Sequence, residues 1–243
     1  WPAELRARIA LAVARLSEAG RRLRELASPG SGPGYHRTVT PTRTAEAGMR
    51  ATVVRRRFSV AEFGRLVEAG LAHPDERLEL LDGEVVRMSP IGKRHAACVF
   101  WLNRALGVQC SNAALVSVQS PLRLDDETEL YPDVALLTPR DDFYRGNMPA
   151  GRDALLVVEV ADTSLAYDLG TKAPRYGRAG VHTMWVVDLQ GGVVEVLSEP
   201  SAGGFDLRRT VRPGAVLTYP LLPTLSIAAA DLPAGGEAIM SFL

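Results

Sequence analysis

Short apolar runs separated by polar turns are the main pattern of this chain between residues 78 and 197. Residues 78–81 and 84–87 flank an Asp-Gly pair, which predicts a tight hairpin because these residues tolerate positive backbone angles. Residues 155–160 form a nearly continuous aliphatic run, typical of a strand that is buried on both faces. Residues 183–188 and 193–197 predict a further pair of strands.

Helical spacing of apolar residues appears in three segments between residues 59 and 179. Ser59 and Glu62 form a capping box that begins a helix ending at Gly70. Residues 93–106 predict a second helix, and residues 164–179 predict a third, with Pro174 near its start or kinking it. The predicted buried stripe of the second helix comprises Cys98, Trp101, Leu102 and Leu106.

The remaining elements are short. Residues 114–118, 121–124 and 131–137 predict strands, residues 207–211 an edge strand, and the tail from Pro213 a surface wrap. Helices and strands in this order predict an α/β (α+β) fold, with helices packed on the faces of a sheet.

The first 48 residues differ in composition from the rest. Residues 4–26 place leucines and other apolar residues at helical spacing among arginines, and residues 28–34 have the composition of a linker. We predict a helical N-terminal extension over residues 1–48, translated from upstream of a start at Met49, and a domain over residues 49–243. The alternative is a basic arm that contacts a partner or nucleic acid.

Composition narrows the functional classes. The chain has 28 Lys and Arg against 28 Asp and Glu, so binding of nucleic acid would need a local basic patch. Hydrophobic residues make up 47% of the chain, yet no run of eighteen apolar residues is present, which predicts no contact with a membrane. Cys98 and Cys110 lack metal-ligand spacing, so we expect reduced thiols and a cytoplasmic protein.

Two carboxylates within apolar segments are the main candidates for chemistry. Asp133 lies in the predicted strand 131–137, and Glu159 lies in the aliphatic run. A buried carboxylate needs a compensating partner, and consecutive strands are usually neighbours. The pair therefore predicts a site for Mg²⁺ or Mn²⁺, which could activate water on a phosphodiester. Alternatively, Asp133 caps a turn and Glu159 pairs with an arginine.

Four further residues could take part in such a site. Lys172 follows Asp168 by four residues, so Asp168 could hold the ammonium near the carboxylates, or the two could form a surface ion pair. Glu79 could supply a third carboxylate or lie on a solvated hairpin face. His95 could contact phosphate or transfer a proton, or be structural. The sequence has no glycine-rich phosphate loop, nucleophile-elbow serine motif or Cys-His metal spacing.

An ordered set of short motifs joins these residues. They read Leu-Glu-Leu-Leu-Asp-Gly-Glu from position 78, Pro-Asp-Val from 132, Val-Val-Glu-Val from 157, Asp-Leu-Gly-Thr-Lys from 168, Ala-Gly-Val from 179 and Trp-Val-Val-Asp from 185. Over residues 58–197 this set resembles the bacterial Uma-type restriction endonuclease family, within the PD-(D/E)XK nuclease superfamily. The resemblance implies a restriction-endonuclease-like core, with a mixed central sheet flanked by helices, and magnesium-dependent cleavage of DNA.

The resemblance also implies roles for individual residues. Asp133 and Glu159 match the family's metal ligands, Glu79 its early acidic position and His95 the histidine at the start of a helix. Lys172 matches a lysine that the family carries on the following helix. Asp168 and Tyr176 match other recurrent family positions, and Ala161 stands where the wider superfamily usually has its lysine. Two departures from the family are residues 161–164, where its members often have a serine-proline-rich turn, and the first 48 residues, which have no counterpart.

These observations lead to three hypotheses. The first is a Mg-dependent endonuclease in which Asp133 and Glu159 bind metal and Lys172 orients or activates water, with Asp168 holding Lys172 and Glu79 assisting. The second is a catalytically silent module with a nuclease fold that binds nucleic acid or protein. The third is a metal-dependent hydrolase of a smaller phosphoester. A homodimer would suit cleavage of both strands of DNA.

Overall fold

The computed structural model describes residues 56–70 and 76–233, all of which belong to one unit spanning residues 53–243. The predicted N-terminal extension, and its predicted boundary with the domain at residues 48–49, lie outside the described residues.

A six-stranded mixed sheet forms the centre of the domain, as the sequence predicts. Its strands lie in the order β10-β9-β8-β7-β6-β3, and every neighbouring pair is antiparallel except β7 and β8. The parallel pair fits the helical crossover that links these two strands. The strands are β3 (Leu115–Val118), β6 (Val134–Leu137), β7 (Ala154–Ala161), β8 (Thr183–Asp188), β9 (Val193–Ser201) and β10 (Gly204–Val211).

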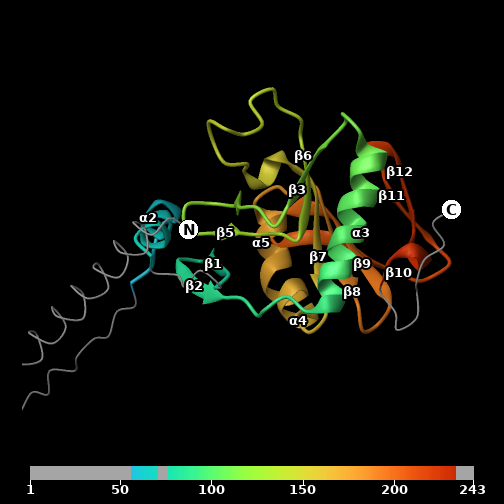
Figure 1. The fold of residues 1–243 in the computed structure, drawn as a ribbon, viewed down its shortest axis with the longest axis horizontal. Coiled ribbons are helices and arrows are strands. Elements are labelled where there is room, and N and C mark those ends of the chain that lie inside the picture. The colour runs from blue at the N-terminus through green and yellow to red at the C-terminus, as the bar shows by residue number, and fades with distance from the viewer. Residues whose placement is uncertain (1–55, 71–75, 234–243) are drawn as a thin grey trace, which may run out of the picture. The chain divides into compact units, whose positions relative to one another are not determined.

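Helices cover both faces of this sheet (Figure 1). Helix α3 (Lys93–Cys110) packs on one face and extends four residues beyond its predicted end, and α5 (Ala173–Arg178) packs on the other. Successive residues of β7 alternate between the two cores. Val158 packs with α3, whereas Val157 packs with α5, as expected from the two-residue period of a strand.

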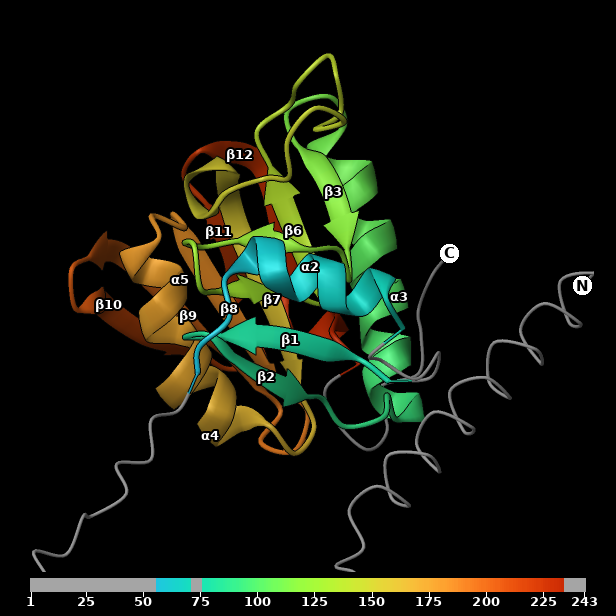
Figure 2. The same ribbon diagram turned by 90° about the vertical axis from the view of Figure 1, so that its left-hand side faces the viewer.

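A second, four-stranded sheet lies beside the first, in the order β2-β1-β5-β4. Asp82 and Gly83 both have positive φ, 49° and 76°, so the turn between β1 and β2 is the tight hairpin that the Asp-Gly pair predicts. Figure 2 shows helix α2 beside β1. The bounds are α2 (Val60–Glu68), β1 (Leu78–Leu81), β2 (Glu84–Arg87), β4 (Leu122–Arg123) and β5 (Glu129–Leu130).

The predicted strand over residues 131–137 is only partly correct. The strand of the large sheet begins at Val134, whereas Glu129–Leu130 pairs within the small sheet. Pro132 separates them because proline has no N–H to donate to a strand ladder. The chain therefore passes from one sheet to the other just before Asp133.

The predicted helix over residues 164–179 divides into three parts. Helix α4 (Leu165–Tyr167) leads into a π turn (Asp168–Lys172) and then into α5. The N–H of Ala173 donates to the carbonyl of Asp168, five residues earlier, which marks the wider turn. Pro174 follows at once and has no N–H for an ordinary helical bond, which favours such an irregularity at this point.

The prediction that the tail is a surface wrap is wrong. Residues 216–228 form a hairpin of β11 (Val216–Tyr219) and β12 (Leu222–Ala228). Leu217, Tyr219, Leu225 and Ile227 are buried in the core that contains α3, at the alternate spacing of strands. The short strands, and Pro223 within β12, obscure this period in the sequence. In the described part of the chain, no helix has the length and apolar character needed to cross a membrane.

Candidate active site

The two carboxylates expected from the sequence lie opposite each other. Val134 of β6 pairs with Val158 of β7 in the antiparallel register, so the next position places Asp133 across from Glu159. Both side chains are buried, with exposed fractions of 4% and 3%. The local sequence explains this position, because Asp133 follows the proline that ends pairing in the small sheet.

Lys172 supplies the positive charge for this site. It ends the π turn, and its Nζ donates to Glu159 Oε1 at 3.2 Å and to Glu79 Oε1 at 3.0 Å. Glu79 lies on β1 of the small sheet and is only 1% exposed, so it is not on the solvated hairpin face that was the alternative. Lys172 therefore joins a carboxylate from each sheet.

The protonation of this cluster follows from burial and charge. Burial raises the pKa of Glu159 to about 8, the ammonium of Lys172 opposes the rise, and the charge of Asp133 adds to it. Burial alone would lower the pKa of Lys172, but the carboxylates of Glu159, Glu79 and Asp168 raise it well above its ordinary value. Lys172 is therefore an ammonium at neutral pH.

Asp133 is held by three hydrogen-bonding groups. Its Oδ2 accepts from the N–H of Val160 at 2.9 Å and lies 2.9 Å from Nε2 of His95, while its Oδ1 accepts from the amide of Gln119 at 3.2 Å. Burial would raise the pKa of Asp133, but these contacts outweigh burial and lower the pKa below its usual value. Asp133 is therefore an ionised carboxylate at neutral pH.

His95 enters the site from the first turn of α3. Its Nε2 is occupied by the contact with Asp133, whereas its Nδ1 is buried and has no hydrogen-bond partner among the described residues. The tautomer follows from the contact, because a neutral ring that donates from Nε2 leaves Nδ1 as an acceptor.

Asp168 does not form the ion pair with Lys172 that the sequence suggested. Within the described residues, the ion pairs of Lys172 are with Glu79 and Glu159. Asp168 instead accepts a hydrogen bond from Ser164 at 2.6 Å and influences Lys172 through its charge. The physical reason is competition, because two other buried carboxylates already lie at hydrogen-bonding distance from the ammonium.

Sequence reasoning missed several polar groups of the site. Tyr176 is buried and its hydroxyl donates to Glu159 Oε1 at 2.7 Å, a contact that its recurrent family position did not specify. Gln119 has a positive φ of 46°, which is uncommon for this residue type, and contacts Asp133. The hydroxyl of Tyr167 is buried without a hydrogen-bond partner in the part of the chain that is described. No local spacing in the sequence reveals these contacts.

A divalent cation needs several oxygen ligands, and the protein supplies part of such a set at this site. Across residues 56–70 and 76–233, no group of three or more His, Cys, Asp or Glu side chains is arranged to hold a metal ion. Mg²⁺, however, needs only one or two protein carboxylates when water and phosphate complete its ligands. The opposed carboxylates of Asp133 and Glu159 fit such a cation in chemical type.

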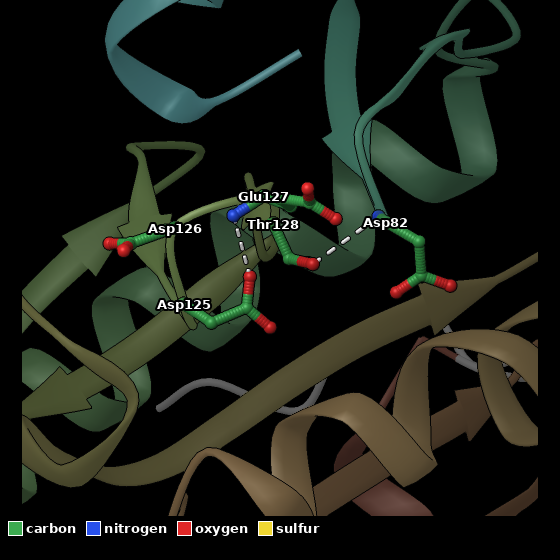
Figure 3. Close-up of a pocket in the computed structure, with 5 residues that line it drawn as sticks. All are labelled: Asp82, Asp125, Asp126, Glu127 and Thr128. Carbon is green, nitrogen blue, oxygen red and sulfur yellow. Dashed lines mark hydrogen bonds between the residues drawn. The ribbon is translucent and has the colours of Figure 1, made fainter. Parts of the chain in front are cut away.

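An acidic pocket near the hairpin turn is separate from this site (Figure 3). Its volume is about 520 Å³. Its carboxylates are engaged elsewhere: Asp82 pairs with Arg175, Asp126 with Arg123 at 2.5 Å, and Asp125 accepts from the N–H of Glu127 at 2.8 Å. Residues 125–127 form an exposed acidic loop. The pocket is lined by Asp82, Asp125, Asp126, Glu127 and Thr128.

Comparisons with known proteins agree with this fold. A search of curated proteins finds no match to the sequence. Among solved structures, the chain is similar to a DUF820 protein from Anabaena variabilis, described as "a putative nuclease", with a TM-score of 0.58 and 14% identity. The match covers 73% of this chain and 98% of that one, and at this identity it shows a shared fold.

A family model also matches residues 60–230, which include every candidate site residue. The model is that of Uma2, described as "Putative restriction endonuclease". Its match spans most of the chain and both sheets. The chain therefore belongs to the Uma2 family of restriction-endonuclease-like proteins.

Proposed function

We propose that this protein is a metal-dependent endonuclease that hydrolyses phosphodiester bonds of DNA. Family membership supports a nuclease-type function. The observation that carries the proposal is the buried pair of Asp133 and Glu159, with the ammonium of Lys172 bound to Glu159. Two carboxylates and one ammonium supply the charges that metal-assisted phosphoryl chemistry needs.

In this proposal, Asp133 and Glu159 hold Mg²⁺ or Mn²⁺. The bound ion would supply Lewis acidity and lower the pKa of water. Asp133 is ready for this role as an ionised carboxylate, because its hydrogen bonds keep its pKa low. Because the pKa of Glu159 is raised, Glu159 has to lose a proton before it can bind the metal, and this loss costs free energy. The adjacent ammonium of Lys172 lowers the pKa and so reduces that cost.

Lys172 acts as a hydrogen-bond donor in this proposal. Because its pKa is raised, its Nζ keeps its protons at neutral pH and does not serve as a general base. The ammonium would orient the attacking water or stabilise charge on a phosphate oxygen. Glu79 binds the ammonium directly, and the Tyr176 hydroxyl holds the other partner, Glu159, through a buried hydrogen bond.

His95 is the residue best placed to receive a proton. Its Nε2 contacts Asp133, which fixes the ring, and its Nδ1 has no hydrogen-bond partner among the described residues. With Nε2 donating to Asp133, Nδ1 would be the ring atom that accepts a proton during hydrolysis.

The test is cleavage of plasmid and oligonucleotide DNA with Mg²⁺ or Mn²⁺, and with EDTA. Asp133→Ala and Lys172→Ala should each reduce the cleavage rate by at least about 100-fold, the scale seen when one electrostatic group is removed from a site. Asp126→Ala is the matched control, because this carboxylate is exposed and lies in the acidic loop. Cleavage that persists unchanged in both site variants would contradict the proposal.

The second candidate is a nuclease-fold module that binds nucleic acid or protein without cleaving it. It is favoured by the position of Lys172, whose ammonium already compensates Glu79 and Glu159 without a metal. DNA binding that is retained in EDTA, with no cleavage under any metal, would support this candidate.

A further inference from the structure

A pocket next to the candidate active site is lined by apolar and aromatic side chains as well as polar ones. It lies between α2 and β1, and its volume is about 380 Å³. Figure 2 shows the two elements side by side. The walls combine apolar, aromatic and polar side chains. They include Phe63, Val67, Leu78, Glu79, Gln119 and Tyr131.

Two of these residues connect the pocket with the candidate active site. Glu79 lines the pocket, and its Oε1 accepts hydrogen bonds from Lys172 and from the N–H of Tyr131, at 3.0 and 3.1 Å. Gln119 also lines it and donates to Asp133. A molecule in the pocket would therefore lie beside residues that hold both Asp133 and Lys172.

One carboxylate oxygen of Glu79, a residue that lines the pocket, has no hydrogen-bond donor among the described residues. Oε2 of Glu79 is buried and receives no hydrogen bond from the residues that the structure describes. A buried carboxylate oxygen without a donor is costly and uncommon. The chemistry that would satisfy it is an N–H donor on a ligand whose remaining surface is flat and apolar enough to fit beside Phe63 and Tyr131.

We propose that this pocket receives one nucleobase, turned out of the strand, whose phosphodiester lies at the Asp133–Glu159 site. This inference rests on the proposed function. An amino group of the base would donate to Oε2 of Glu79, and its ring would pack against the apolar and aromatic wall. A base that is stacked and paired in a duplex cannot enter such a pocket, so the preferred substrate is single-stranded or locally unpaired DNA.

The test compares two labelled single strands of equal length and charge, one complete and one with abasic sites at its centre. Binding is measured by fluorescence anisotropy in EDTA, so that no cleavage is required. The full-length protein should bind the complete strand about ten-fold more tightly, the scale of one base stacked on an aromatic wall. Equal affinity for the two strands, or no binding of either, would overturn the inference.

A substitution at the mouth of the pocket locates the effect. Val67 is 41% exposed, so Val67→Trp should fill the pocket without disturbing the core and should bring the ratio of the two affinities close to one. Ala61→Trp adds the same ring to an exposed position of α2 and should keep the wild-type ratio. Wild-type behaviour of Val67→Trp would count against this pocket.

The outcomes separate this inference from the proposed function. Base-dependent binding without cleavage under Mg²⁺ or Mn²⁺ would support the pocket and contradict the nuclease. Metal-dependent cleavage at equal rates for complete and abasic strands, and for paired and unpaired DNA, would support the nuclease and contradict the pocket.

Discussion

At the scale of single residues, the ammonium of Lys172 is the group on which two buried glutamates depend. Glu79 and Glu159 are almost fully buried, and both accept hydrogen bonds from Lys172. A buried ion pair contributes little when compared with an apolar replacement of both partners, but removing one partner leaves an uncompensated charge. The stability of the domain should therefore be sensitive to Lys172.

We expect Lys172→Met to reduce the free energy of unfolding by about 3–5 kcal/mol, because the buried side chains of Glu79 and Glu159 both lose the ammonium that they contact. Urea denaturation followed by circular dichroism measures this loss. Arg87→Met, which removes an exposed pair with Glu76, should cost less than about 1 kcal/mol. In the double variant Lys172→Met with Glu159→Gln, the loss should be smaller than the sum of the single losses. Strict additivity would show that Lys172 and Glu159 do not interact.

The sequence indicated the types of the site residues but not all of their partners. The sequence predicts that Asp133 and Glu159 are neighbours, because they belong to consecutive predicted strands and a buried charge needs a compensating partner. The contact between Lys172 and Glu79 spans 93 residues of the chain, and the local spacing favoured Asp168 instead. The roles of the six candidate residues stay predictions until cleavage is measured.

At the scale of elements, close packing between α5 and β10 depends on the absence of side chains. A Cβ atom on Gly177 would lie 2.1 Å from the carbonyl oxygen of Gly204. Backbone cannot move aside as the end of a flexible side chain can. This contact fixes the helix that follows Lys172 against the sheet.

Gly177→Ala should therefore destabilise the domain by about 1–3 kcal/mol through overpacking. Gly64→Ala is the matched control, because it lies in α2 and a Cβ there would meet nothing within 4 Å. Alanine is the better helix former, so this control should be neutral or more stable by up to about 1 kcal/mol. Thermal unfolding of the two variants measures the difference, and a similar midpoint for both would contradict the close contact.

Elements with strong local patterns could be predicted, and those set by tertiary contacts could not. The capping box, the Asp-Gly hairpin and the aliphatic strand β7 appear where the sequence places them. The π turn could not be located, because helical spacing does not distinguish a turn of five residues from an ordinary one. The change of sheet at Pro132 could not be predicted, because it depends on pairing of β5 with β1, which lies far away in the sequence.

At the scale of the whole molecule, the hairpin β11–β12 completes the core on the α3 face. Leu225 is fully buried there, whereas Leu221, in the turn of the same hairpin, is 50% exposed. The mixed central sheet and the family are predictable from the sequence, whereas the pattern of this hairpin predicts a surface wrap. Its apolar residues alternate over strands too short to distinguish from loop sequence.

Leu225→Ala should reduce the free energy of unfolding by about 2–5 kcal/mol, the usual cost of a cavity in a core. Leu221→Ala should change it by less than about 0.5 kcal/mol, because this side chain is at the surface. Denaturation in urea measures both values. Equal and small effects would restore the interpretation of the tail as a surface wrap.

The contact of Lys172 with Glu79 and Glu159 joins two sheets that are otherwise formed by separate strands. Glu79 comes from an early hairpin, Glu159 from the central strand, and Lys172 from the turn that follows. A newly made chain cannot assemble this cluster before all three segments have emerged and both sheets have docked. Assembly of the charges is thus coupled to completion of the fold, so a partly folded chain would carry only an incomplete charge cluster. Under the proposed nuclease function, this arrangement would keep misfolded copies inactive.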